Sequence, residues 1–125
     1  MINEIKNTLA QLLDAKRLAH TFAVCEAAVV LAERFGADKN KAYLAALLHD
    51  CARGFDMEQL VNYCTENGLE LDEHMQNDIN PVHALVGAEM AKRHFGIDDT
   101  EITNAINRHA VGYENMTLLV DTPHG

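Results

Sequence analysis

The sequence predicts an all-α protein, a bundle of about six helices in a single domain. Apolar residues recur at the three- and four-residue spacing of amphipathic helices along most of the chain. No stretch shows the apolar-polar alternation of a half-buried strand, and no internal repeat or low-complexity tract is present. The 125 residues match the common domain size of roughly 100 to 150 residues.

The first two helices are predicted by their apolar spacing and by a terminal glycine. The first is amphipathic and could lie across the bundle, with its apolar side chains at Ile2, Ile5, Leu9, Leu12 and Leu13. The second runs from about Ala15 to Phe35 and is closed by Gly36, the residue type that best tolerates a left-handed C-terminal position. Two apolar lines predict that it is covered on two sides: Leu18, Phe22, Cys25, Val29 and Val24, Ala28, Leu31, Phe35.

The central helix is predicted from the almost wholly apolar run between residues 41 and 54. Asp38 is a natural N-cap for it and Gly54 ends it. A helix without a polar face has neighbours all round, so His49 and Asp50 near its end need partners. A core histidine beside a solvated carboxylate is one interpretation of this pair. A metal site is the other, because adjacent ligating side chains at a buried helix end suit a metal ion.

Capping signals define the remaining helices. Asp56 and Gln59 resemble a capping box, and the helix they open stops at Asn67-Gly68. The acidic segment from Leu69 to Ile79 is predicted to be a loop that includes one turn of helix. Asn80-Pro81 then starts a helix that places His83 in its first turn, where free N–H groups bind phosphate readily.

The last helix begins at Asp98 or Asp99 and has one apolar face. That face carries Ile102, Ala105, Ile106 and His109, so His109 points toward the core. A polar group on such a face is expected to have a partner, for which a metal, a phosphate or another histidine are candidates.

Five short segments, in order, resemble a known family. They are Arg17-Leu-Ala-His20-Thr, Leu44-Ala-Ala-Leu-Leu-His-Asp50, His83-Ala-Leu-Val-Gly-Ala88, Asn104-Ala-Ile-Asn-Arg-His109 and Met116-Thr-Leu-Leu119. The order of their histidines is similar to that of the HD-domain metal-dependent phosphohydrolases, and the residues around these histidines resemble the YqeK-type subgroup. The resemblance implies an HD-domain-like bundle that hydrolyses diadenosine tetraphosphate symmetrically to two ADP.

The resemblance also implies roles for individual residues. His20, His49 and Asp50 would be metal ligands. Asp50, Arg53, His83 and His109 would form the catalytic group, in which Arg53, His83 and His109 also bind the substrate. Arg53 stands where the subgroup usually has Lys, which changes a point charge into a planar fork. Imidazole with carboxylate suits a divalent transition metal better than calcium; iron or manganese is favoured, with zinc, cobalt or magnesium as alternatives.

A further aspartate is expected in this family on a helix after the segment that matches residues 116–119. The sequence ends six residues later, so we expect the C-terminal part of the family domain to be missing. Asp121 comes too early to match that ligand. Asp121 or His124 is a candidate substitute ligand if the end of the chain folds back.

Composition limits the partners. The formal charge of -9 argues against binding to a nucleic acid polymer, which requires a basic surface, and it means that an anionic nucleotide needs a locally cationic site. No window approaches the roughly 20 apolar residues of a membrane span, and no signal peptide is evident, so we expect a cytoplasmic protein without membrane contact. Three cysteines without CxxC spacing favour free buried thiols.

Two classes of function follow. The first is the phosphohydrolase, with a small nucleotide as its substrate; guanosine tetraphosphate or a deoxynucleotide is a weaker alternative to diadenosine tetraphosphate. The second is a catalytically weak or inactive HD-fold module that binds a metal or nucleotide or serves in protein interaction. A short C-terminus would expose apolar residues at Met116, Leu118 and Leu119, which predicts a homodimer.

Overall fold

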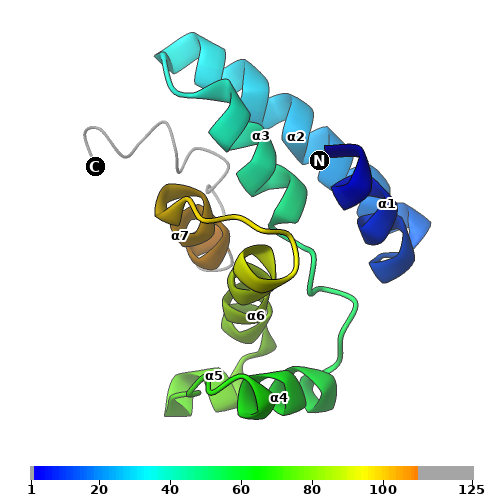
Figure 1. The fold of residues 1–125 in the computed structure, drawn as a ribbon, viewed down its shortest axis with the longest axis vertical. Coiled ribbons are helices and arrows are strands. Elements are labelled where there is room, and N and C mark those ends of the chain that lie inside the picture. The colour runs from blue at the N-terminus through cyan, green and yellow to red at the C-terminus, as the bar shows by residue number, and fades with distance from the viewer. Residues whose placement is uncertain (1, 110–125) are drawn as a thin grey trace.

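The computed structural model describes residues 2–109, the last two by their backbone alone, and in this part of the chain the regular elements are all helices (Figure 1). Its helices are α1 (Ile2–Leu12), α2 (Ala15–Phe35), α3 (Lys39–Leu48), α4 (Met57–Glu66), α5 (Glu73–Asn77), α6 (Ile79–Arg93) and α7 (Thr100–His109). The all-α prediction is confirmed. The seventh helix, relative to the six expected, is the five-residue α5 within the segment predicted as a loop with one helical turn.

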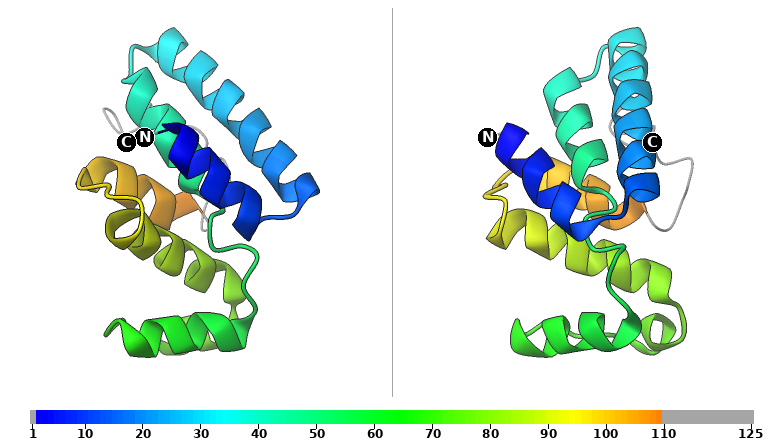
Figure 2. Two further views of the ribbon diagram at one scale, coloured as in Figure 1. Left: turned by 45° about the vertical axis from the view of Figure 1, so that its right-hand side comes forward. Right: turned by 90° about the vertical axis from the view of Figure 1, so that its right-hand side faces the viewer.

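The helices form two groups joined through α6 and α7. Figures 1 and 2 show α1, α2 and α3 at one end of the molecule and α4 with α5 at the other. α3 is the central element, because it packs along α2 on one side and against α6 and α7 on the other. The small residues of α6 permit this close packing: Ala84, Gly87, Ala88 and Ala91 are all buried, as the sequence predicted.

α2 has the predicted bounds, but its two predicted apolar lines are only partly covered. Its buried residues are Thr21, Val24, Cys25, Ala28 and Ala32, all facing the interior. Phe22 and Phe35, one on each predicted apolar line, are exposed. The predicted cover on two sides is therefore incomplete, because α2 lies at the edge of the bundle and α1 packs against only part of it (Figure 2). Gly36 closes the helix with φ 74°, as expected.

The central helix ends six residues earlier than Gly54, which is a second correction. α3 stops at Leu48, and the chain continues through hydrogen bonds between residues three apart: His49 N to Ala46 O, Cys51 N to Leu48 O, Arg53 N to Asp50 O and Phe55 N to Ala52 O. The physical reason lies at Ala46, whose carbonyl accepts from both the backbone and the ring of His49. A carbonyl engaged in this way does not continue the α-helical ladder. We call residues 49–55 the His-Asp turn.

The start of α6 is also corrected. Asp78, not Asn80, is the N-cap, and its carboxylate accepts from the backbone N–H of Asn80 at 3.1 Å. Pro81 becomes the third helical residue, a position at which its missing N–H costs nothing because the first four N–H groups have no intrahelical partner. His83 consequently lies in the second turn of α6 and is buried, whereas the sequence placed it in the first.

The other capping predictions are confirmed. Asp38 accepts from the backbone N–H groups of Asn40 and Lys41, and Asp56 and Gln59 form a reciprocal capping box. Cys25, Cys51 and Cys64 are free and buried. Among the helices of residues 2–109, none combines the length and the apolar content that a bilayer crossing requires.

α3 and α7 lie side by side and run in the same direction. At their starts, Lys41 Nζ pairs with Asp99 at 3.2 Å and Glu101 at 2.6 Å. Further along, Leu48 and Ile106 both border Gly87 of α6. The C-terminal ends of the two helices therefore share one side of the molecule, and that side carries the His-Asp turn.

Candidate metal centre

Three predicted ligands, His20, His49 and Asp50, come together where the first turns of α2 pass the end of α3. One ligand atom from each lies within 4.8 Å of the others. Two ligands of a single ion with bonds of about 2.0 to 2.2 Å can be no more than about 4.4 Å apart. Side-chain shifts of less than about 1 Å would therefore close the set around an ion. His49 and Asp50 are buried and His20 is exposed, which leaves one side of the cluster open to a small molecule.

His49 has a fixed tautomer. Its Nδ1 lies 2.5 Å from the carbonyl oxygen of Ala46, and a carbonyl can only accept, so Nδ1 carries a proton and donates it. Its other nitrogen, Nε2, faces Asp50 Oδ2 at 3.2 Å. This contact is favourable if the imidazole is protonated, or if both atoms direct lone pairs at a cation. A backbone acceptor that orients the imidazole in this way is the usual support of a metal-ligating histidine.

Arg53 connects this cluster with α6. Its Nη2 lies 3.4 Å from Asp50 Oδ1, and its Nη1 donates to the side-chain oxygen of Asn80 at 3.4 Å. The guanidinium is about one third exposed, and its buried Nε has no hydrogen-bond partner among the described residues. Arg53 is thus held beside Asp50 with donors to spare, which suits binding of an anion.

Burial favours the neutral form of His83. Its Nε2–H donates to the carbonyl oxygen of Phe55 at 3.0 Å. Burial lowers the pKa of His83 below the usual 6.5, although the bond to Phe55 works in the opposite direction. The remaining nitrogen, Nδ1, is buried without a hydrogen-bond partner among residues 2–109. In this tautomer Nδ1 is an acceptor, so His83 offers a site for a hydroxyl group, a water molecule or a proton.

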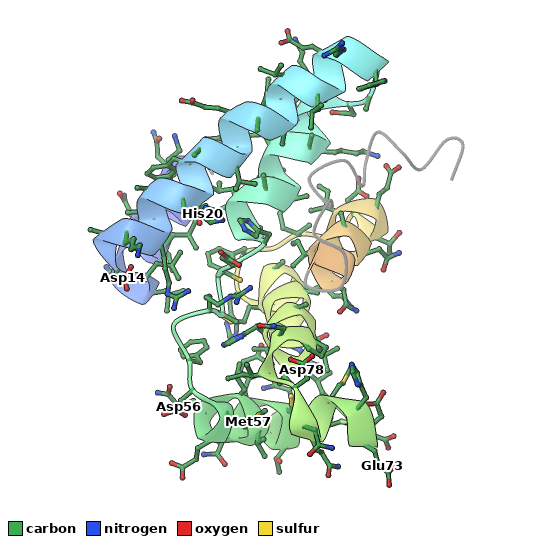
Figure 3. The ribbon with its side chains drawn as sticks, turned by 180° about the vertical axis from the view of Figure 1, so that it is seen from behind. Asp14, His20, Asp56, Met57, Glu73 and Asp78 are labelled. Atoms are coloured by element: carbon green, nitrogen blue, oxygen red, sulfur yellow. The ribbon has the colours of Figure 1, made fainter. Side chains whose placement is uncertain are left out.

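A pocket of about 410 Å³ opens beside the cluster and changes the sign of the local charge. It is lined by Asp14, Lys16, Arg17, His20, Asp50 and Arg53. Three of these side chains are cationic and two are carboxylates, so the pocket is slightly positive in a protein whose net charge is -9. Figure 3 shows Asp14 and His20 at the same end of α2, the end from which Lys16 and Arg17 also reach the pocket.

Lys16, Arg17 and Asn80 were not among the site residues predicted from the sequence. Arg17 had a detectable signal, since it precedes His20 by three residues and so shares its helix face. Asn80 had none, because its contact with Arg53 joins residues 27 apart.

The structure does not describe the side chains of the site candidates near the C-terminus. The backbone of His109 ends α7 on the side that carries the His-Asp turn, but its side chain lies outside the described residues. Asp121, His124 and the apolar segment at residues 116–119 also lie outside the described part.

The helical bundle and its buried His-Asp pair define a class of protein, and the chain belongs to the HD domain family, whose match covers residues 17–121. Among its relatives, the symmetrical bis(5'-nucleosyl)-tetraphosphatase of Bacillus subtilis is 40% identical over 111 residues, which is 87% of this chain and 58% of the relative. The protein of the same name from Halalkalibacterium halodurans is 36% identical over 107 residues, 86% of this chain and 57% of the relative.

A solved structure agrees in fold. The crystal structure of a predicted HD superfamily hydrolase involved in NAD metabolism from Clostridium acetobutylicum superposes with a TM-score of 0.80 at 34% identity. The match covers 87% of this chain and 58% of that structure. The chain therefore spans less than two thirds of the length of these relatives.

Proposed function

We propose that the chain is a metal-dependent phosphohydrolase that cleaves a phosphoanhydride bond of a nucleotide, with diadenosine tetraphosphate hydrolysed to two ADP as the favoured reaction. The observation that carries the proposal is the convergence of His20, His49 and Asp50 beside a pocket that contains Lys16, Arg17 and Arg53. The names of the Bacillus and Halalkalibacterium relatives support the substrate.

The donor set fits a divalent transition metal, with iron or manganese proposed first. Two imidazoles and a carboxylate suit these ions, and the bond from His49 to Ala46 orients one imidazole before an ion arrives. A metal ion held there would polarise a phosphoryl oxygen and lower the pKa of a water molecule.

The side chains of the pocket would bind and orient the phosphate chain. Arg53, tethered to Asp50 and Asn80, would place one phosphate next to the ligand cluster. Lys16 and Arg17 would neutralise phosphates further along the chain, at the exposed mouth of the pocket. His83, neutral and with a free acceptor, would take a hydrogen bond from a water molecule or a nucleotide hydroxyl. His109 is proposed as a further phosphate contact.

In symmetrical cleavage the central phosphoanhydride bond breaks. Water supplies one oxygen to one ADP, and the bridging oxygen leaves with the other ADP. The cationic side chains stabilise the charge that appears on the departing phosphate, which is the usual protein contribution to phosphoryl transfer.

The test is a product analysis with purified protein loaded in turn with iron, manganese or zinc. Diadenosine tetraphosphate should yield ADP without ATP or AMP on anion-exchange chromatography. In water enriched in ¹⁸O, half of the ADP should carry one heavy oxygen. His49→Ala/Asp50→Ala is the matched control, which should lose both metal and product. Metal-loaded protein that releases neither ADP nor phosphate at high concentration, from this substrate or from guanosine tetraphosphate and deoxynucleotides, would refute the proposal and leave a binding module.

We also propose a cytoplasmic homodimer. Three free buried cysteines are consistent with a reducing compartment, and Val30 and Phe35 present exposed apolar surface near one end of α2. A monomer in light scattering at micromolar concentration would contradict the dimer, and export of a tagged chain would contradict the location.

A further inference from the structure

We infer that Gly54 is a positioning residue for the candidate metal centre. Its missing side chain lets the His-Asp turn pack directly against the end of α1, which holds the turn in place. A Cβ atom at residue 54 would lie 2.6 Å from the carbonyl oxygen of Leu12, in the last turn of α1. Real Cβ atoms essentially never approach an atom so closely. The positive-φ residues of residues 2–109 are Gly36, Gly68 and Gly96, so Gly54 is required for space and not for an unusual backbone conformation.

The His-Asp turn is held from its other side by α6. The thiol of Cys51 donates to the carbonyl oxygen of Gly87 at 3.6 Å, and the carbonyl oxygen of Phe55 accepts from His83. The turn is therefore enclosed between the end of α1 and one face of α6. Because close-packed interiors transmit strain, an atom added on the α1 side has to displace one of the two partners.

The turn is the partner that would move. α1 is anchored in the core through Ile5 and Leu9, and Leu13, which directly follows it, is also buried. The turn is held by hydrogen bonds between residues three apart, which have poorer geometry than those of an α-helix. Gly54 directly follows Arg53 and is four residues from Asp50. A displacement at Gly54 would therefore shift the carboxylate and the guanidinium relative to His20, which lies on a different helix.

Two other glycines provide matched controls. A Cβ at Gly87 would meet Cys51 Sγ at 3.6 Å and Ile106 at 3.7 Å, which are ordinary van der Waals contacts, so Gly87→Ala adds a methyl group beside the same turn without a clash. A Cβ at Gly36 would meet nothing within 4 Å, but its φ of +74° strains any other residue. Gly36→Ala therefore lowers stability far from the metal centre.

The experiment compares Gly54→Ala, Gly36→Ala and Gly87→Ala with the wild-type chain. Three quantities are measured: the affinity for Mn²⁺ by calorimetry, the visible absorption spectrum of the Co²⁺ form, and hydrogen exchange of the backbone amides of residues 49–55 without metal. Gly54→Ala should bind Mn²⁺ at least tenfold more weakly, alter the Co²⁺ spectrum and speed exchange in the turn. Both controls should leave all three unchanged, even where Gly36→Ala lowers the unfolding midpoint in urea.

Wild-type behaviour of Gly54→Ala would overturn the inference, and so would equal losses in Gly54→Ala and Gly36→Ala. If Gly54→Ala does not fold, Leu9→Ala and Leu60→Ala replace it, since both leucines are fully buried, one on α1 and one on α4. Loosening α1 should speed exchange in residues 49–55 and weaken Mn²⁺ binding; loosening α4 should do neither. Equal effects would again overturn the inference. It rests on the proposed metal site, but its readouts need no nucleotide, so it can fail or succeed independently of the proposed hydrolysis.

Discussion

Replacing Arg53 with glutamine should weaken nucleotide binding and strengthen metal binding. The guanidinium lies 3.4 Å from Asp50 Oδ1, and the Asp50 side chain is only 9% exposed. Removing a partner from a buried polar group costs about 1 to 3 kcal/mol. Arg53 is 29% exposed and solvent screens the pair, so we expect the lower end, about 1 kcal/mol of unfolding free energy in the metal-free protein.

In the metal-loaded protein a cation neutralises Asp50, so the same substitution should cost almost nothing there. A difference of about 1 kcal/mol between the two forms equals a roughly fivefold gain in metal affinity by thermodynamic linkage. Nucleotide binding should change in the opposite direction. Loss of one charge-assisted hydrogen bond, about 1.5 to 3 kcal/mol, predicts a roughly 10- to 150-fold rise in KM.

The assays for Arg53→Gln are urea unfolding with and without Mn²⁺, Mn²⁺ calorimetry, and KM for diadenosine tetraphosphate. Arg34→Gln is the control, because this residue lies in the last turn of α2, away from the metal centre. Weaker metal binding in Arg53→Gln, with unchanged stability of the metal-free form, would refute the reasoning, since Arg53 would then not be balancing the charge of Asp50.

Three further predictions concern stability and reactivity. Burial keeps the pKa of His83 below 6.5, so as the pH falls through about 6.5 the unfolded chain binds a proton that the folded chain does not bind. The unfolding free energy should therefore fall from pH 7.5 to 5.5, and it should fall less steeply in His83→Asn. Equal slopes for the two proteins would contradict this prediction. Asp56→Ala removes the acceptor for Gln59 N–H and should cost about 1 kcal/mol in urea unfolding, with no change in Mn²⁺ affinity. Burial raises the pKa of Cys25 to about 11 and that of Cys51 to about 12, so iodoacetamide at pH 8 should label neither until urea is added; rapid native labelling would show that the core opens locally.

The sequence predicted best those features that are determined within a few residues. The bounds of α2 and the caps at Asp38 and Asp56 follow from local hydrogen bonds between side chains and nearby N–H groups. The C-terminal end of α3 and the start of α6 were misplaced where two local signals competed. At His49 the ring takes the carbonyl that the next helical turn would need, and at Asp78 a carboxylate outcompetes Asn80 as the cap.

The structure brings together the three residues that the sequence predicted as metal ligands, but their surroundings were not predicted. The apolar run before His49 indicates burial, which made the His-Asp pair conspicuous in the sequence. The contacts that complete the centre join distant positions, such as Arg53 with Asn80 and Gly54 with Leu12. These contacts cannot be predicted from the spacing of residues in the sequence, because they form only when α1 and α6 enclose the His-Asp turn.

The placement of the pocket at the beginning of α2 and beside the end of α3 has an electrostatic consequence. A helix carries a partial positive charge at its first turn and a partial negative charge at its last. Lys16 and Arg17 lie in the first turn of α2, and His49 caps the last turn of α3. The macrodipoles of the two helices thus divide the site into an anion-attracting half and a cation-attracting half. A metal ion and a phosphate chain would each meet a favourable field from the backbone alone, before any side chain moves.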